Sequence, residues 1–287
     1  MADGDKLLNQ PGDGDESVNE SKLSGFHKLS IPERVRAIRD RGLLSEEEAK
    51  ALLGGDRLLT LSNADAMIEY VIGVMGLPLG LALNFLVNGK DYVVPLSVEE
   101  PSVVAALNFA AKTVRAAGGF RTGSTEPILV GQIQVVDVPH ASRARQNLLQ
   151  RKEEVLNLAN SLHPRLVARG GGATDLEVVL YPSRGDLPEM LVVHLLVDTC
   201  DAMGANLVNS MCEGVASLIE KMPGGRVFLR IMSNLTDRAV VRATVEIPSE
   251  ELTNNGFDGE QVRDGIVIAG QFAEIDPYRA TTHNKGI

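Results

Sequence analysis

The stretch LLVDTCDAMGANLVNSM, residues Leu195–Met211, decides the fold of this chain. It ends the apolar run Leu191–Val197, passes through a turn of small residues, and continues with apolar residues at helical spacing, which predicts a strand followed by a helix. Asp201 is expected to cap that helix, because its carboxylate can accept from backbone N–H groups two or three residues on. The positive end of such a helix attracts phosphate, and Gly204 lets a ligand approach the backbone closely. An ordinary capped helix packed on a strand fits the same pattern.

The composition limits the class of protein. The 287 residues allow one large domain or two ordinary ones, and 44% hydrophobic residues can form a core. The net charge of −10 argues against a nucleic-acid partner, which needs a basic surface. Cys200 and Cys212 do not form a disulfide framework, and no apolar run is long enough for a bilayer. Because Met1 is followed by acids and not by a leader, we expect a soluble, cytoplasmic protein with no membrane segment.

The first part of the chain reads as a tail followed by small helices. Residues 1–24 are polar and acidic, and we expect them to be disordered. Three helix-start signals follow. Ser30 precedes Ile31-Pro32, which puts a proline in the first turn of a helix. Ser45 with Glu48, and Ser62 with Asp65 ahead of a helix at 66–72, have the three-residue spacing of a capping box.

A hairpin and a longer helix come next. Asn88-Gly89 stands between two apolar runs and predicts a two-residue hairpin turn. The helix expected at 103–117 has Pro101 at its first position and the acids Glu99 and Glu100 just outside it. These acids either favour the helix dipole or include a catalytic acid whose pKa is raised beside an apolar helix.

From Ile128 onward the pattern predicts the order β-α-β-β-α-β. The expected strands are 128–138, 175–181, 190–197 and 227–232, and the expected helices are 141–168 and 206–222. This order is typical of a ferredoxin-like split unit. The Gly170-Gly171-Gly172 run precedes a strand, so it is read as turn chemistry and not as a dinucleotide fingerprint.

The C-terminal part is expected to contain a strand at 239–247, a capped helix near Ser249 and a helix at 261–273. The final segment contains Arg279, His283 and Lys285, which could bind an anion or polarise a carbonyl, although a solvated basic terminus fits as well. No spacing of His and Cys is typical of zinc, so no metal is predicted.

Five segments in fixed order carry a family resemblance. They are MIEYVIGVMGLPLGLALNF (67–85), VPLSVEEPSVVAA (94–106), VDTCDAMGAN (197–206), RIMSNLTD (230–237) and DPYRATTHNKGI (276–287). Together they resemble class II 3-hydroxy-3-methylglutaryl-coenzyme A (HMG-CoA) reductase, the soluble bacterial and archaeal type. The resemblance runs from about residue 31 to residue 287.

The resemblance implies an α+β fold with two domains. A mainly helical domain, 25–125 and 233–287, would bind the coenzyme A thioester. A ferredoxin-like domain at 126–232, inserted in it, would bind a nicotinamide nucleotide. The implied reaction, in the mevalonate or isoprenoid pathway, reduces HMG-CoA to mevalonate and coenzyme A by two hydride transfers from NADH or NADPH.

The resemblance also implies residue roles. The family's proton-donating glutamate falls on Glu100, and its oxyanion-stabilising lysine falls on Lys285. Ser102 and Arg279 match positions that hold the carboxylate of the HMG group, and Asn234 matches a residue of the substrate and cofactor pocket. Because family members are dimers with sites between subunits, Glu100 and Lys285 are expected to meet across the interface of a homodimer or higher oligomer.

The nucleotide site is implied by the DAMGAN segment: Asp201, Met203, Gly204, Ala205 and Asn206. His163 stands where some NAD-preferring members place an acid for the ribose hydroxyls. With Arg165 nearby, a 2′-phosphate could be tolerated, so the choice between NADH and NADPH stays open. Glu69 is kept on the substrate side, but Tyr70 replaces a smaller residue of the family pattern there.

The family continues beyond the lysine motif with an aspartate and a mobile segment carrying a histidine, whereas this chain stops at Ile287. His283 does not match that histidine. A general acid of this kind is typically worth ~10² to 10⁴-fold in rate. The alternative expectation is therefore a non-catalytic fragment that binds coenzyme A or a nucleotide.

Overall fold

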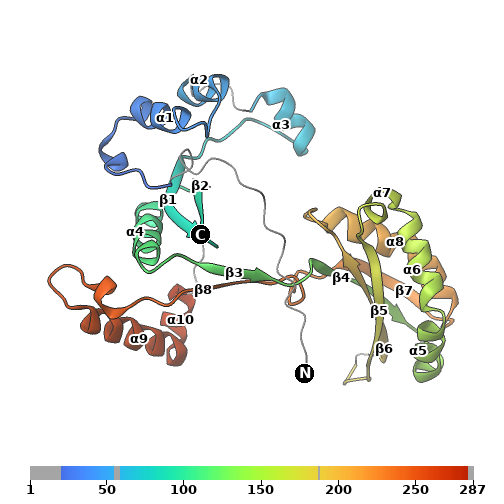
Figure 1. Ribbon diagram of the computed structural model, residues 1–287. Helices are drawn as coiled ribbons and strands as arrows, with labels where there is room; N and C mark the ends of the chain where they lie inside the picture. The colour runs from blue at the N-terminus through green and yellow to red at the C-terminus, as the bar shows by residue number, and fades with distance from the viewer. Residues whose placement is uncertain (1–20, 55–58, 187, 284–287) are drawn as a thin grey trace. The chain divides into compact units, whose positions relative to one another are not determined.

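The computed structural model describes residues 21–54, 59–186 and 188–283. The chain divides into two compact units, an inner one of residues 123–242 and an outer one of residues 1–122 and 243–287 (Figure 1). Two strands that pair with each other, β3 (Arg121–Ser124) and β8 (Val241–Thr244), carry the chain from one unit to the other. The inner unit extends beyond the predicted insertion at both ends, and the binding roles of the two domains stay predictions.

The inner unit is a four-stranded antiparallel sheet in the order β5-β6-β4-β7. Its strands are β4 (Ile128–Val136), β5 (Gly172–Tyr181), β6 (Met190–Asp198) and β7 (Arg226–Met232). Its helices are α5 (Ala141–Gln150), α6 (Lys152–Ser161) and α7 (Pro164–Val167) between β4 and β5, and α8 (Ala205–Lys221) between β6 and β7. The predicted β-α-β-β-α-β order is therefore confirmed.

One long helix was expected at 141–168, and this prediction is wrong, because the segment forms three helices. His163 has a non-helical backbone, with φ −130° and ψ 59°, and Pro164 begins α7, in keeping with the bias of a residue before proline against helical backbone. Arg151 separates α5 from α6 with φ −101°, and nothing in the local sequence explains that break.

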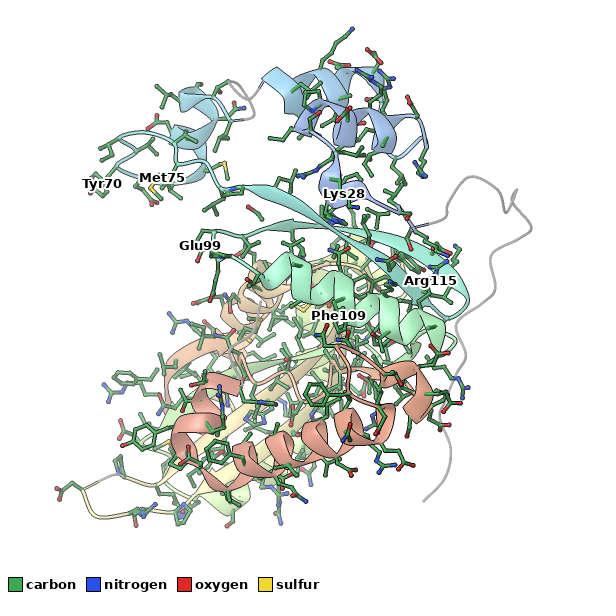
Figure 2. The ribbon with its side chains drawn as sticks, turned by 90° about the vertical axis from the view of Figure 1, so that its left-hand side faces the viewer. Lys28, Tyr70, Met75, Glu99, Phe109 and Arg115 are labelled. Atoms are coloured by element: carbon green, nitrogen blue, oxygen red, sulfur yellow. The ribbon has the colours of Figure 1, made fainter. Side chains whose placement is uncertain are left out.

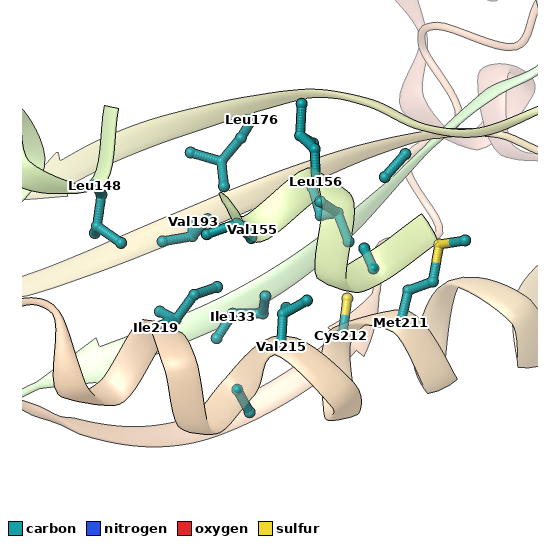
Figure 3. Packing of buried hydrophobic residues seen from close by; sticks show 14 of the residues in the cluster. Ile133, Leu148, Val155, Leu156, Leu176, Val193, Met211, Cys212, Val215 and Ile219 are labelled. Atoms are coloured by element: carbon teal, nitrogen blue, oxygen red, sulfur yellow. The ribbon is translucent and has the colours of Figure 1, made fainter. Parts of the chain in front are cut away.

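The core of the inner unit lies between the sheet and its helices. Odd-numbered residues of β4 and β6, such as Ile133 and Val193, face the helices and are fully buried. Val215 and Ile219 of α8 meet them (Figure 3). Burying each such aliphatic side chain contributes about 1.5–3 kcal/mol, so a shift in register that exposed these residues would be costly.

The outer unit contains the predicted hairpin, β1 (Leu79–Val87) and β2 (Lys90–Ser97). Asn88 and Gly89 both have positive φ, 51° and 76°, as a two-residue turn of this kind requires. Helix α4 (Val103–Ala116) packs on β1, where the Asn108 amide donates to the Leu81 carbonyl at 3.1 Å. The hairpin prediction is confirmed.

The N-terminal helices of the outer unit are η1 (Phe26–Lys28), α1 (Ile31–Arg39), α2 (Glu46–Gly54) and α3 (Leu61–Met67). The caps expected at Ser30 and Ser45 are present. The third prediction is wrong: Thr60 caps α3 by accepting from the Asn63 backbone at 3.1 Å, and the helix ends at Met67. Tyr70 has a left-handed φ of 59°, which is incompatible with a right-handed helix over 66–72.

The predicted disordered tail lies mostly outside the described residues, but its end is held. Ser21 is 1% exposed. Its backbone N–H and hydroxyl both donate to the Asp91 carboxylate, at 2.7 and 2.6 Å, and Arg115 pairs with the same carboxylate at 2.6 Å. The disorder predicted up to residue 24 is wrong for Ser21, because this part-buried charge network orders it.

The C-terminal part of the outer unit contains η2 (Ser249–Leu252), α9 (Gly259–Ile275) and α10 (Pro277–His283). The helix expected near Ser249 is a short 3-10 turn, and the strand expected at 239–247 is reduced to β8. Within the described ranges, no helix has the length and apolar character needed to cross a membrane.

Candidate functional site

The turn between β6 and α8 is built by short polar contacts. The Asp198 carboxylate accepts from the Cys200 backbone at 2.8 Å, and Cys200 has a φ of 53°. Thr199 is 2% exposed, and its hydroxyl donates to the Pro127 carbonyl at 3.3 Å. Gly204 occupies the N-cap of α8 with a φ of 91°. The turn is thus held by Asp198 and Thr199 just before the start of α8.

Asp201 does not cap α8, so that prediction is wrong. The helix begins at Ala205, too far along the chain for the predicted contact, and the Asp201 carboxylate instead pairs with Arg169 at 3.2 Å. No side chain among the described residues caps the first turn of α8. Its N–H groups are therefore placed to bind an anion.

Close packing is one reason why residue 204 is a glycine. A Cβ added there would lie 2.6 Å from Thr199 Cγ2 and 2.8 Å from Leu129 Cδ1. The prediction that the glycine makes room for a ligand stays a prediction. Beside it, the Met203 side chain is 79% exposed, Asn206 is exposed, and Ala205 is half-buried.

A cavity of about 380 Å³ lies between α6, α7 and α8 of the inner unit. It is lined by Leu162, His163, Pro164, Arg165, Leu166, Arg169 and Leu207. His163 is fixed there, because its Nε2 lies 2.6 Å from the Ser210 hydroxyl of α8. Leu207 belongs to the first turns of α8, so the cavity adjoins the uncapped helix end. Arg169 was missed from the sequence, although it directly precedes the glycine run.

Asn234 lies in the loop between β7 and β8 and is exposed. The Ser233 backbone donates to the Val130 carbonyl at 2.8 Å. The loop therefore leaves the sheet at a fixed point.

The acids Glu99 and Glu100 lie between β2 and α4 in the outer unit, and both are exposed. Figure 2 labels Glu99 in this segment. The prediction that Pro101 begins the helix is wrong. Ser102 is the N-cap, with a left-handed φ of 71° and no side-chain cap hydrogen bond, and the helix starts one residue later. The Ser102 hydroxyl is thus not used as a cap.

Glu69 lies in the segment after α3 that forms neither helix nor strand, and it is exposed. Tyr70 next to it is 98% exposed, and Met75 is 90% exposed. Figure 2 shows both side chains projecting from this segment. The segment thus presents apolar side chains to its surroundings.

Arg279 lies on α10, where its backbone donates to the Asp276 carboxylate at 2.6 Å. Its Nε is buried and makes no hydrogen bond with the residues that the structure describes. A buried donor of this kind normally has a partner. His283 lines a second cavity, of about 720 Å³, between α9 and α10. Lys285 lies outside the described residues, so its meeting with Glu100 stays a prediction.

Among the described residues, no group of three or more His, Cys, Asp or Glu side chains is arranged to bind a metal ion. What the inner unit offers is an uncapped helix end, a cavity and two guanidinium groups. Within the described part of the chain, the outer unit offers an exposed acid, a serine hydroxyl that caps no helix, and a guanidinium whose buried Nε makes no hydrogen bond. Phosphate binding and carboxylate binding are the chemistry that these groups support.

Comparison with known proteins agrees with the predicted resemblance. A reductase from Archaeoglobus fulgidus, named 3-hydroxy-3-methylglutaryl-coenzyme A reductase, is 46% identical over 93% of this chain and 59% of its own length. A probable reductase of the same name from Borreliella burgdorferi is 31% identical over 94% of this chain and 61% of its own length. The chain thus spans about three-fifths of these curated relatives.

Solved structures give the same result. The 3-hydroxy-3-methylglutaryl-coenzyme A reductase of Streptococcus pneumoniae is 39% identical, with a TM-score of 0.85 over 91% of this chain and 70% of the other. A class II reductase structure from the same organism, described as bound to NADPH in open conformations, is 38% identical with the same TM-score. The family model for hydroxymethylglutaryl-coenzyme A reductase matches residues 30–287. With the five motifs, the split β-α-β-β-α-β unit and this match in agreement, the chain belongs to the hydroxymethylglutaryl-coenzyme A reductase family.

Proposed function

We propose that this chain takes part in the reduction of HMG-CoA to mevalonate and coenzyme A, with NADPH as the hydride donor. The observation that carries the proposal is the buried Nε of Arg279, which makes no hydrogen bond with the residues that the structure describes. A guanidinium with a free donor fits the carboxylate of the HMG group, which it can hold in bidentate fashion. The reductases similar to this chain bear the name of the same substrate.

The inner unit is the proposed nucleotide-binding domain. The uncapped first turn of α8 suits the pyrophosphate, with Gly204, Ala205 and Asn206 beside it. When bound, the nicotinamide nucleotide supplies the hydrides.

NADPH is the proposed cofactor, in preference to NADH. Arg165 and Arg169 line the cavity next to the α8 start, and they suit the extra 2′-phosphate. His163, fixed on Ser210, lines the same cavity and adds a donor.

The outer unit is the proposed thioester-binding domain. Glu100 donates a proton to the reduced carbonyl oxygen, and Lys285 stabilises the negative charge that develops there. Ser102 and Arg279 hold the HMG carboxylate, while Asn234 and Glu69 contact the substrate. No step in this scheme requires a metal ion.

The assembly is proposed to be a homodimer or a higher oligomer, with sites at the subunit interface, in the cytoplasm. Three side chains of the segment after α3 are almost fully exposed: Tyr70 at 98%, Ile72 at 104% and Met75 at 90%. Exposed apolar groups gathered on one segment mark an interaction surface.

The test follows NADPH absorbance while the full 287-residue chain is incubated with HMG-CoA. Glu100→Gln is expected to lower turnover by about 10²- to 10⁴-fold, because the proton donor is lost. Glu99→Gln is the matched control, since it removes the neighbouring charge. Binding of both ligands with no turnover, even at high protein concentration, would favour a non-catalytic binding fragment. Absence of both turnover and binding would refute the proposal.

The cofactor preference has a test of its own. Arg165→Gln and Arg169→Gln are each expected to raise the Kd for NADPH by about tenfold, which corresponds to ~1.4 kcal/mol. The Kd for NADH, which lacks the 2′-phosphate, should change by less than about twofold. Equal losses for both nucleotides would contradict the assignment of these arginines to the 2′-phosphate.

A further inference from the structure

The loop that carries Asn234 is held at both ends, and each end is fixed by a different part of the inner unit. It spans residues 233–240, between β7 and β8. At its start, the Met232 backbone donates to the Asn209 side chain of α8 at 2.8 Å. The Leu235 backbone then donates to the Ser233 hydroxyl at 3.1 Å. Residues 234–237, between the two ends, are exposed.

The far end of the loop is held by an ion pair. Arg238 Nη1 and Nη2 donate to the two carboxylate oxygens of Glu177, each at 2.9 Å. The Thr125 hydroxyl donates to the Arg238 carbonyl at 2.8 Å and accepts from the Val240 backbone at 2.9 Å. A bidentate guanidinium–carboxylate pair fixes direction as well as distance, so Arg238 restrains the loop in a way that a single hydrogen bond would not.

Glu177 is itself part of a row across the sheet. It is opposite His194, which is opposite Gln132, which is opposite Ile231 of β7. Gln132 Nε2 lies 3.0 Å from His194 Nε2. Burial lowers the pKa of His194, which favours the neutral ring that can accept from this amide. The row therefore links the anchor of Arg238 to the strand from which the loop departs.

We propose that Arg238 is a positioning residue, which holds the loop 233–240 on Glu177 so that Asn234 faces bound substrate or cofactor. This inference rests on the proposed function, because Asn234 has its role only there. The ion pair is about 40% exposed on each side, so it contributes little to global stability. Its effect is expected on the conformation of the loop and not on the folding of the unit.

The first experiment measures amide hydrogen exchange of the full chain by mass spectrometry. Arg238→Gln is expected to speed exchange of the Leu235, Ala239 and Val240 amides by about three- to tenfold, because the far anchor is lost. Arg238→Lys, which keeps the charge but not the fork, should give an intermediate value. Arg151→Gln is the matched control, since Arg151 forms a bidentate pair with Glu154 in the same unit.

Glu177→Gln should reproduce the exchange pattern of Arg238→Gln, because it removes the other half of the same pair. Unchanged loop exchange in both variants would overturn the proposal. Faster exchange throughout the inner unit would also overturn it, since that result would indicate a general loss of stability.

The second experiment titrates NADPH and HMG-CoA into the same variants. Arg238→Gln is expected to weaken binding of at least one of them by about fivefold to tenfold. In the Asn234→Ala background the same change should cost less than about twofold, because it acts through Asn234. Full additivity would overturn the proposal. If the unmodified chain binds neither probe, the proposed function fails, while the exchange data still decide whether Arg238 anchors the loop.

Discussion

Replacing Gly204 by alanine tests how the start of α8 is built. The residue has a φ of 91°, where a side chain costs about 1–2 kcal/mol. The added Cβ would also lie 2.6 Å from Cγ2 of Thr199, which is buried and tied to Pro127, so this neighbour has little freedom to move. Overpacking of this kind costs about 1–3 kcal/mol. We therefore expect Gly204→Ala to lower the free energy of unfolding by about 2–5 kcal/mol.

The assay is urea unfolding followed by circular dichroism, with and without NADPH. Gly224→Ala is the matched control, because Gly224 also has a positive φ, 72°, but its Cβ would meet nothing within 4 Å. It should show only the backbone cost of about 1–2 kcal/mol. At 100 times its Kd, NADPH should stabilise the unmodified chain by about 2.7 kcal/mol. Gly204→Ala should be stabilised by less, because the helix end that we propose to bind the phosphates is displaced.

Two results would refute this reasoning. If Gly204→Ala costs no more than Gly224→Ala, the close packing against Thr199 does not limit the site. If Gly204→Ala destabilises the chain but keeps the full NADPH increment, the start of α8 does not hold the nucleotide.

Three further predictions follow from charged and reactive groups. Burial raises the pKa of Asp91, but hydrogen bonds from Arg115 and Ser21 outweigh this effect and lower the pKa, so the chain should lose stability as pH falls below about 4. Asp91→Asn should lower the free energy of unfolding by about 2 kcal/mol at pH 7 and reduce its pH dependence below about pH 4, as urea unfolding can measure. Burial lowers the pKa of His194, so the unfolded chain binds its proton more readily; stability should fall as pH drops below about 6.5, and His194→Gln should remove this dependence in the same assay. Burial raises the pKa of the Cys212 thiol to about 12, so iodoacetamide at pH 8 should modify it only after unfolding, as mass spectrometry can check.

The sequence was sufficient where local signals and burial agree. The alternating residues of β4 and the apolar run of β6 predict strands because their apolar side chains are buried in the core. Asn88-Gly89 predicts the hairpin because both residues tolerate positive φ. Ser30 predicts a helix start because its cap involves only residues within one turn. In each case the physical cause lies within a few residues of the signal.

The sequence was insufficient where residues far away in the chain determine the local structure. The sequence predicts that Asp201 caps a helix, but its carboxylate forms an ion pair with Arg169, thirty-two positions earlier in the chain. Ser21 reads as part of a disordered tail, but Asp91 and Arg115 order it. The same holds for the candidate site: its residues are predicted from the motifs, whereas the cavity beside α8 depends on how residues 162–169 pack near Leu207.

The backbone itself offers an independent reason to place function in the motif segments. Positive φ is uncommon for residues other than glycine and costs energy. Tyr70, Ser102 and Cys200 all adopt it, and each lies in one of the segments that carry the family resemblance. Glycine at these positions would remove the cost, so the side chain that is present needs a reason of its own. For Ser102 the hydroxyl caps nothing, so stability does not supply that reason. A ligand contact is the role that we propose for it, and this inference runs from an observed backbone outlier to a hypothesis of function.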